Sequence, residues 1–191
     1  MEHTPTIQTV IELIDSLYST NCRLLVSIDG RCASGKTTLA AALQERYGCT
    51  VIPMDHFFLR PEQRTADRLA VPGENVDHER FLKEVLLPLK RGEAFSYRPF
   101  DCGRMVLGDP IAVNPTGLTV IEGSYSCHRS LRELYDLRIF LTVDPQEQMR
   151  RLIIRNGDYA EVFRKKWIPL EEQYFSVSDA ETHWDLRLCT G

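Results

Sequence analysis

The stretch of residues 24–43, LLVSIDGRCASGKTTLAAAL, constrains the fold of this chain more than any other segment. Its first part is a continuous apolar run, a pattern typical of a parallel strand that is buried on both faces of a sheet. Its last part favours a helix over residues 37–47, with Leu39, Ala40 and Leu43 on the inward side. A buried strand that turns directly into a helix indicates an α/β fold with a mostly parallel sheet covered on both faces.

The turn between these two elements, GRCASGKT, has the spacing G-x-x-x-x-G-K-[ST] of a phosphate-binding loop. Glycines let the backbone turn so that several N–H groups face one anion, and the helix N-terminus adds the positive end of its dipole. We expect Lys36 to neutralise the β- and γ-phosphates of ATP and the Thr37 hydroxyl to coordinate Mg²⁺. The predicted nucleotide-binding residues are Gly30, Ala33, Ser34, Gly35, Lys36, Thr37 and Thr38. The alternative, a chance glycine-rich turn, is disfavoured because strand, spacing and helix agree.

The rest of the chain alternates between strand-like and helix-like segments, and we expect a single domain over residues 1–191. The pattern predicts further strands in residues 50–55, 117–125, 136–144 and 183–190, and helices over residues 7–18, 77–92, 145–155 and 159–174. Pro88 is expected to end or bend the helix over residues 77–92. Residues 60–75 predict a long functional loop, and residues 95–108 predict a small hairpin.

Composition narrows the class of partner and the location. With 23 basic and 27 acidic residues the chain is slightly acidic, which argues against nucleic acid or an anionic membrane as a partner. The N-terminal segment lacks the basic start and apolar core of a signal peptide, and no apolar stretch has the length of a membrane span. The six cysteines form no C-x-x-C pair, so reduced thiols in the cytoplasm are expected. The sequence is compatible with a homo-oligomer and does not specify the oligomeric state.

Three acidic residues extend the predicted site. Asp55 ends the second predicted strand, at the sheet edge where ligands bind, and is a candidate base for an attacking hydroxyl; an ordinary turn aspartate is the alternative. Glu122 ends another apolar strand and is a candidate magnesium ligand, with a solvated strand-end glutamate as the alternative. Gly123 directly after it indicates a close backbone approach. Asp77 suits the N-cap of the helix that follows, a role that is compatible with ligand binding.

Basic residues gather in the stretch MRRLIIRNGD. On a helix Arg151 and Arg155 are four residues apart and share a face, whereas Arg150 points elsewhere. Such a pair can stabilise the charge that spreads over a transferring γ-phosphoryl group. A solvated basic face is the alternative, and the spacing alone favours it.

The motifs SIDGRCASGKT, PMDHFF, NVDHERF, YRPFDC, VIEGSYS and IPLEEQYF follow one another in this order along nearly the whole chain. This ordered set resembles the uridine kinase-like P-loop kinases, a group akin to phosphoribulokinase and pantothenate kinase. The resemblance implies a P-loop NTPase fold, a three-layer sandwich with a parallel five-stranded sheet, a substrate hairpin and a mobile helical lid at about residues 150–160. It also implies ATP and Mg²⁺ as cofactors and a small-molecule phosphate acceptor.

The resemblance also implies roles for individual residues. Asp55 matches the general base, Asp77 a holder of substrate hydroxyls, and Glu122 the magnesium-site acid. Tyr97 and Phe100 fall in the hairpin that encloses base and sugar. The lid region contains Arg150, Arg151 and Arg155, of which Arg150 is expected to bind substrate and the other two to act in catalysis.

The chain departs from the family pattern at two points. The arginine-rich lid is cut short at RNGDY, and Cys102 stands where uridine kinases place a histidine near the uracil. A nucleoside is therefore the first expectation for the acceptor, and pantothenate, nicotinamide riboside or a sugar-like alcohol is the alternative. A regulatory NTPase is the alternative from another class, although the D-x-x-G and N-K-x-D strings of switch GTPases do not occur.

Overall fold

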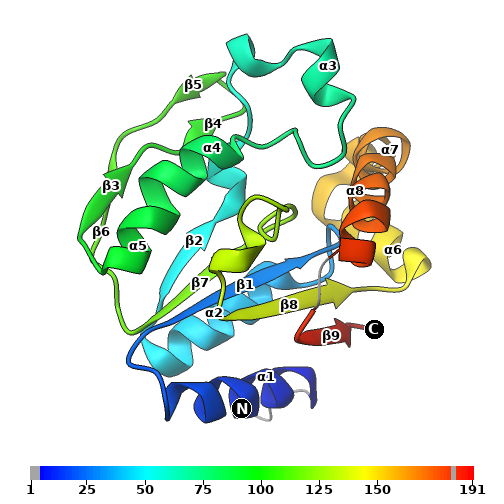
Figure 1. Cartoon of the computed structure of the whole chain (residues 1–191). Helices are drawn as coiled ribbons and strands as arrows, with labels where there is room; N and C mark the ends of the chain where they lie inside the picture. Colours follow the sequence, from blue (N-terminus) through cyan, green and yellow to red (C-terminus); the bar gives the residue numbers. More distant parts are fainter. Residues whose placement is uncertain (1–4, 182–183) are drawn as a thin grey trace.

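The computed structural model of the chain describes residues 5–181 and 184–191 and is built around a five-stranded sheet. The strand order is β2-β7-β1-β8-β9, and every neighbouring pair is parallel (Figure 1). The strands are β1 (Leu24–Gly30), β2 (Thr50–Pro53), β7 (Leu118–Glu122), β8 (Leu137–Thr142) and β9 (Leu186–Cys189). The predicted parallel α/β sheet is thereby confirmed, and the five strands lie where the apolar runs place them.

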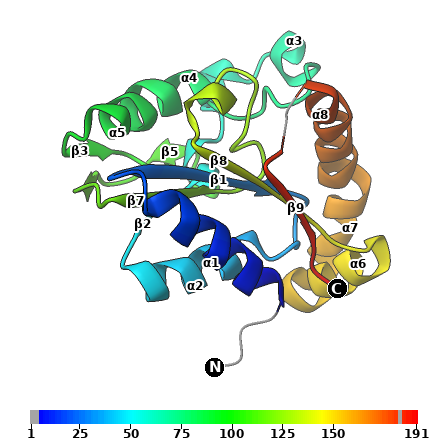
Figure 2. The same cartoon turned by 60° about the horizontal axis from the view of Figure 1, so that its bottom comes forward.

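Helices cover both faces of this sheet, which makes three layers (Figures 1 and 2). One face packs against α1 (Pro5–Tyr18) and α2 (Lys36–Tyr47) through an apolar cluster that includes Leu24, Val26 and Ile28 of β1. The opposite face packs against the helix that follows residue 77 and against α8 (Ile168–Glu181). Because successive strand residues point to opposite faces, Leu25 of the same strand belongs to this second cluster.

The helix that follows residue 77 is continuous but changes its winding. It begins as α4 (His78–Phe81), forms a π-helical turn over Leu82–Leu86 and ends as α5 (Leu87–Arg91). The expectation that Pro88 ends or bends this helix is corrected in one respect, because the helix continues to Arg91. Pro88 lies at the start of α5, directly after the π turn, where the missing N–H of a proline is tolerated.

Two excursions lie between the central strands. The predicted functional loop of residues 60–75 is called the acceptor loop below, after the role in acceptor choice that we expect of it. It contains a 3-10 turn over Pro61–Gln63 and the one-turn helix α3 (Ala66–Leu69). Both are too short to show a helical repeat of apolar residues. The predicted hairpin region extends further than expected, to Val113. It contains two antiparallel ladders, β3 (Phe95–Tyr97) with β6 (Ile111–Val113) and β4 (Phe100–Asp101) with β5 (Val106–Leu107).

The lid region is helical throughout its described part. It runs from α6 (Pro145–Asn156) through a 3-10 turn at Gly157–Tyr159 and α7 (Ala160–Val162) to a π turn at Phe163–Trp167 and then α8. The left-hand edge of Figure 1 holds the hairpin region and the right-hand edge the lid helices, with the sheet between them. Among the described residues no helix combines the length and apolarity that a membrane crossing requires.

Candidate active site

A cleft of about 1500 Å³ opens at the carboxyl ends of β1 and β7. Its floor consists of residues 32–39, which include all of the predicted phosphate loop except Gly30 and Arg31. Its walls come from the acceptor loop, the segment after β7 and the lid helices. Asp55 and Glu122 both line it. The sheet edge at which parallel strands end is where α/β proteins bind their ligands, so the fold places the candidate residues in one cavity.

The two glycines of the phosphate loop serve different purposes. Gly30 has φ +137°, and a Cβ at this position would lie 2.0 Å from the carbonyl oxygen of Leu141 on β8. Gly35 has φ +91° with open space around it, so it is needed for its backbone conformation alone. Ala33 shares the left-handed region with φ 58°. The loop therefore turns tightly between β1 and α2 while β8 approaches it closely.

Polar groups converge on the interior of the loop. The Lys36 Nζ donates hydrogen bonds to the carbonyl oxygens of Gly30 and Arg31, at 2.7 and 2.8 Å. The Ser34 side chain is fully buried, and its Oγ has no hydrogen-bond partner within the described residues. A buried cation and an unpartnered hydroxyl in a loop at a helix N-terminus fit the phosphates of a nucleotide.

The two candidate metal-binding residues, Thr37 and Glu122, lie next to each other at this loop. The Thr37 Oγ1 lies 3.3 and 3.2 Å from the two carboxylate oxygens of Glu122, so the two candidate metal-binding groups are adjacent. Burial, followed by the nearby Asp55 carboxylate, raises the pKa of Glu122. Hard oxygen donors and a second negative charge close by fit Mg²⁺. A Cβ on Gly123 would come within 2.9 Å of Met54, so the predicted close backbone approach is confirmed.

Asp55 lies on a 3-10 turn over Met54–Phe57 rather than on β2 itself, which ends two residues earlier. The prediction that Asp55 ends the strand is corrected in this respect. The turn still brings the exposed Asp55 carboxylate to the cleft. The neighbouring His56 instead donates to or accepts from the Tyr97 hydroxyl at 2.9 Å.

The phosphate loop is held by residues of α8 and α6 to which sequence reasoning assigned no role. The buried Glu171 accepts hydrogen bonds from the Cys32 backbone N–H at 2.9 Å and from the Ser124 hydroxyl at 2.8 Å. Gln148 donates to the Cys32 carbonyl oxygen at 2.9 Å. The backbone N–H and the carbonyl oxygen of Cys32 are therefore both hydrogen-bonded to side chains from the lid helices, which holds the phosphate loop in place. The motif IPLEEQYF, which contains Glu171, was the available signal.

A second unassigned carboxylate, Asp29, lies at the end of β1 and is fully buried. Its oxygens accept from the backbone N–H groups of Gly30, Tyr125 and Cys127 at 2.7, 3.0 and 2.9 Å, and from the Tyr174 hydroxyl at 2.9 Å. It thus joins the phosphate loop, the turn after β7 and α8. An aspartate inside an otherwise apolar strand was the sequence signal for it.

Asp29→Asn is expected to lower the free energy of unfolding by about 2–6 kcal/mol, because the amide nitrogen would face two of these donors and leave them unpaired. Burial raises the pKa of Asp29 from 3.8 to about 6, so its ionisation costs stability as the pH rises across that interval and the group is ionised at pH 7. Urea unfolding at pH 7 measures the change. Asp144→Asn is the matched control, since Asp144 caps α6 at the surface and asparagine caps equally well. Equal stability of the two variants would contradict the assigned role of Asp29.

The three lid arginines occupy different positions. Arg151 and Arg155 both line the cleft, as their helical spacing predicts, and Arg150 does not. The Arg151 guanidinium donates to Glu147 at 2.8 Å, to the Ala33 carbonyl oxygen at 3.1 Å and to Thr190. It therefore ties the phosphate loop to the C-terminal strand. The exposed Arg155 lies over the Phe163 ring, and the exposed Arg150 pairs with Glu147.

The candidate acceptor residues Asp77, Tyr97 and Phe100 are buried. Asp77 caps α4 by accepting from the Arg80 N–H at 3.1 Å, which confirms its predicted structural role. Its second oxygen, Oδ2, is buried without a hydrogen-bond partner, 3.6 Å from the Arg60 Nε and 3.6 Å from the Arg80 Nε. Tyr97 and Phe100 are buried, at 4% and 5% exposure. None of Asp77, Tyr97 and Phe100 is among the described residues that line the cleft.

Comparison with known proteins gives consistent relatives. No family model matches the chain. A uridine kinase of Halobacterium salinarum is 24% identical over 183 residues, which cover 87% of this chain and 80% of that protein. A uridine kinase of Chlamydia pneumoniae is 25% identical over 172 residues, with 79% and 75% covered.

Two solved structures match the fold over nearly their whole length. A proposed uridine kinase from Bacillus stearothermophilus has a TM-score of 0.69 at 19% identity, with 95% of this chain and 96% of that chain covered. A proposed fructose transport system kinase from Silicibacter sp. TM1040 has a TM-score of 0.65 at 29% identity, with 96% and 97% covered.

Proposed function

We propose that this chain is a uridine kinase-like P-loop kinase that transfers the γ-phosphoryl group of ATP, with Mg²⁺, to a hydroxyl of a nucleoside, a proposal supported by its similarity to named uridine kinases. The observation that carries the proposal is the shared cleft. It holds the Lys36 loop, the Thr37–Glu122 pair and the exposed Asp55 carboxylate. A phosphate cradle, an oxygen-rich cation site and a base on one cavity are the parts that phosphoryl transfer requires.

Each residue has a stated task in this proposal. Asp55 accepts the hydroxyl proton while the acceptor oxygen attacks the γ-phosphorus and the bond to the bridging oxygen of ADP breaks. Lys36 and the loop N–H groups bind the phosphates and stabilise the charge that develops on them. Thr37 and Glu122 hold Mg²⁺, which supplies further neutralisation of phosphate charge when it is bound. Of the two lid arginines that line the cleft, we assign the approach to the transferring group to Arg155, because Arg151 is engaged by Glu147, Ala33 and Thr190.

The acceptor is the finer part of the proposal. The named uridine kinases favour a nucleoside, and the solved fructose transport system kinase candidate favours a sugar as the second choice. Cys102 lines the cleft, where a thiol offers weaker hydrogen bonding to a pyrimidine edge than an imidazole. Leu69, Val71 and Pro72 give the acceptor-loop wall an apolar surface. Such a wall suits a ring or a methylene-bearing alcohol.

An ADP-release assay tests the acceptor. We expect ATP turnover with Mg²⁺ to rise at least about tenfold on addition of uridine or cytidine, because a correctly placed hydroxyl converts a slow hydrolysis into a directed transfer. Fructose, pantothenate and nicotinamide riboside form the comparison series. Stimulation by fructose alone would replace the nucleoside with a sugar. Slow turnover that no acceptor changes would instead favour a regulatory NTPase.

We place this activity in the cytoplasm, with no nucleic acid or membrane partner. The support is that all six cysteines are free thiols, three of them buried, and that the net charge is −4.

A further inference from the structure

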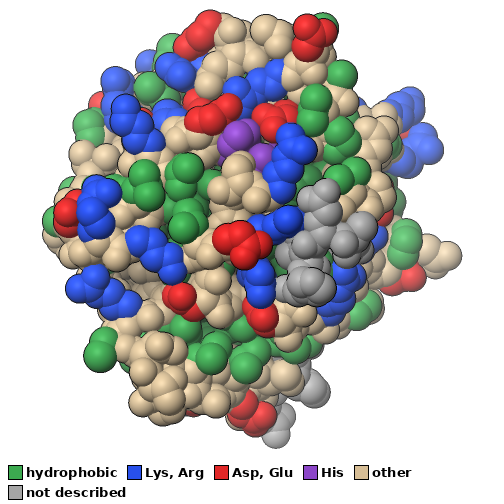
Figure 3. All heavy atoms as spheres, viewed as in Figure 1, with side chains coloured by type: hydrophobic (Ala, Val, Ile, Leu, Met, Phe, Trp, Pro, Cys, Tyr) green, Lys and Arg blue, Asp and Glu red, His purple; other side chains and the backbone are tan. Residues whose placement is uncertain are grey.

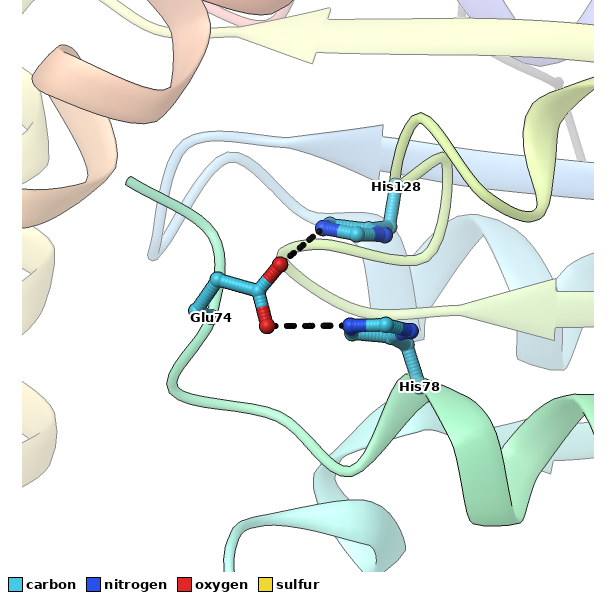
Figure 4. Close-up of side chains that lie close together, drawn as sticks. All are labelled: Glu74, His78 and His128. Atoms are coloured by element: carbon cyan, nitrogen blue, oxygen red, sulfur yellow. Dashed lines mark hydrogen bonds and ion pairs between the residues drawn. The ribbon is translucent and has the colours of Figure 1, made fainter. Parts of the chain in front are cut away.

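Three side chains from separate segments meet beside the acceptor loop, and together they are called the Glu74–His cluster here. Glu74 comes from the end of the acceptor loop, His78 from the first turn of α4 and His128 from the turn after β7 (Figure 4). Both imidazoles direct their Nε2 atoms at the carboxylate, His78 at 3.0 Å and His128 at 3.6 Å. One ligand atom from each residue lies within 4.8 Å of the other two. The three groups thus face a common point.

The opposite edges of the two rings share one hydroxyl. The Ser130 Oγ lies 2.6 Å from the Nδ1 of His128 and 3.1 Å from the Nδ1 of His78. In the tautomer with both protons on Nδ1, the serine hydroxyl oxygen accepts from both rings, and both Nε2 lone pairs point at the carboxylate. A cation between these three electron-pair donors stabilises that tautomer over the one in which Nε2–H donates to Glu74 and the Ser130 backbone N–H donates to the His128 Nδ1 at 3.3 Å. The fixing of Nδ1–H by an outer partner is also how metal-binding histidines are oriented.

His128 supplies an independent indication of a ligand. Its side chain is 2% exposed, and its Nε2 has no hydrogen-bond partner within the described part of the chain. A buried polar atom without a partner is destabilising, so a ligand that satisfies it is favoured. The atom therefore points into the cluster with its bonding capacity unused.

We propose that the Glu74–His cluster binds a divalent transition-metal ion, with Zn²⁺ as the type. The ligands are the Nε2 atoms of His78 and His128 and the Glu74 carboxylate, and water completes a four-coordinate site. Two imidazole ligands favour an ion of intermediate softness such as Zn²⁺ over Mg²⁺, which prefers oxygen ligands. The site is therefore chemically distinct from the Thr37–Glu122 pair. The rings stack 4.1 Å apart at 17°, and binding requires them to tilt toward each other.

Two arginines hold the carboxylate from outside. Arg68 lies 3.6 Å and Arg129 3.4 Å from Glu74 oxygens. Arg68 is also paired at 2.6 Å with Glu79, which offsets its positive charge at the cluster. On the molecular face in Figure 3, histidine side chains come to the surface among acidic and basic groups. The arginines orient the carboxylate rather than fill the space between the rings.

The cluster lies directly next to the cleft wall, so a bound ion would affect that wall. Gly73 and Asn75, the neighbours of Glu74, both line the cleft wall. A bound ion would join this end of the acceptor loop to α4 and to the turn after β7. The inference goes beyond the proposed kinase activity and does not depend on it, since the site contains none of the phosphate-loop residues.

Zinc binding to the full chain without nucleotide or Mg²⁺ tests the proposal. We expect the wild-type protein to take up one Zn²⁺ per chain in competition with a chromophoric chelator near pH 7, and its melting temperature to rise. His78→Gln and Glu74→Gln are each expected to weaken Zn²⁺ binding at least about tenfold. Both side chains are at the surface edge of the cluster, 13% and 14% exposed, so these variants report on binding in a folded protein.

His56→Gln is the matched control, because His56 is a partly buried histidine outside the cluster, bonded to Tyr97. It should bind Zn²⁺ as the wild type does. X-ray absorption at the zinc edge separates this site from the exposed thiols of Cys22, Cys102 and Cys189, since the cluster supplies nitrogen and oxygen only. The absence of uptake, equal uptake by the Glu74 and His78 variants, or a sulfur shell around the zinc would each overturn the proposal.

Discussion

Asp55→Asn is expected to lower kcat by about 10²–10⁴-fold while ATP binding stays close to wild type, because the variant loses only the proton acceptor. The exposed carboxylate lies on a turn, and the hydrogen bonds of the phosphate loop come from other residues. The substitution should therefore leave the fold and the nucleotide site intact. Steady-state ADP release with the preferred acceptor, together with calorimetry of ATP binding, measures the two quantities separately.

Asp109→Asn is a matched control for the loss of one exposed carboxylate, since Asp109 lies in the hairpin region and is not among the described residues that line the cleft. Its turnover should equal that of the wild type. Unchanged turnover in the Asp55 variant would remove this residue from the mechanism.

Lys36→Ala is expected to weaken ATP binding about 10- to 100-fold, the equivalent of one charge-assisted hydrogen bond of about 1.5–3 kcal/mol. Turnover at saturating ATP should fall as well, by about 10²–10³-fold, because the same cation faces the charge that develops in the transition state. Lys36 is 8% exposed at the start of α2, and its Nζ lies against the loop carbonyl oxygens of Gly30 and Arg31. Calorimetry and turnover at several ATP concentrations distinguish the two losses.

Lys166→Ala removes a cation that also lines the cleft but lies on the lid side, 4.5 Å over the Trp167 ring. It should change ATP affinity far less than Lys36→Ala, which separates a specific phosphate contact from the general positive charge of the cavity. Circular dichroism of both variants excludes unfolding as the cause. Full-strength ATP binding by the Lys36 variant would show that the loop amides suffice and that the predicted role of this lysine is wrong.

Most of the sheet was predictable from the sequence because its signals are local and continuous. Parallel strands are buried on both faces and appear as uninterrupted apolar runs, as β1, β7 and β8 do. The short helical turns in residues 60–75 escaped prediction because one turn of helix contains no repeat of the apolar period. The change of winding in the helix that contains Pro88 escaped prediction, because no local pattern in the sequence marks the π turn over Leu82–Leu86.

In the candidate site, too, local features were predictable from the sequence and long-range contacts were not. The phosphate loop is contiguous, so its spacing predicted it, and Thr37 and Glu122 could be paired from strand-end logic. The carboxylates that hold this loop, Asp29 and Glu171, are bonded to groups far along the chain. Helical spacing placed Arg151 and Arg155 on one face, but only their contacts separate the engaged arginine from the exposed one.

The sequence by itself determined the strand–loop–helix unit and the type of fold, because backbone conformation and burial follow from neighbouring residues. Only the tertiary structure decided which distant side chains share a space: Asp29 with the Tyr174 hydroxyl, and Glu74 with His78 and His128. Their partners depend on how the turn after β7, the acceptor loop and α8 pack against one another. Such contacts arise from chain segments that approach only after folding, so no local pattern in the sequence encodes them.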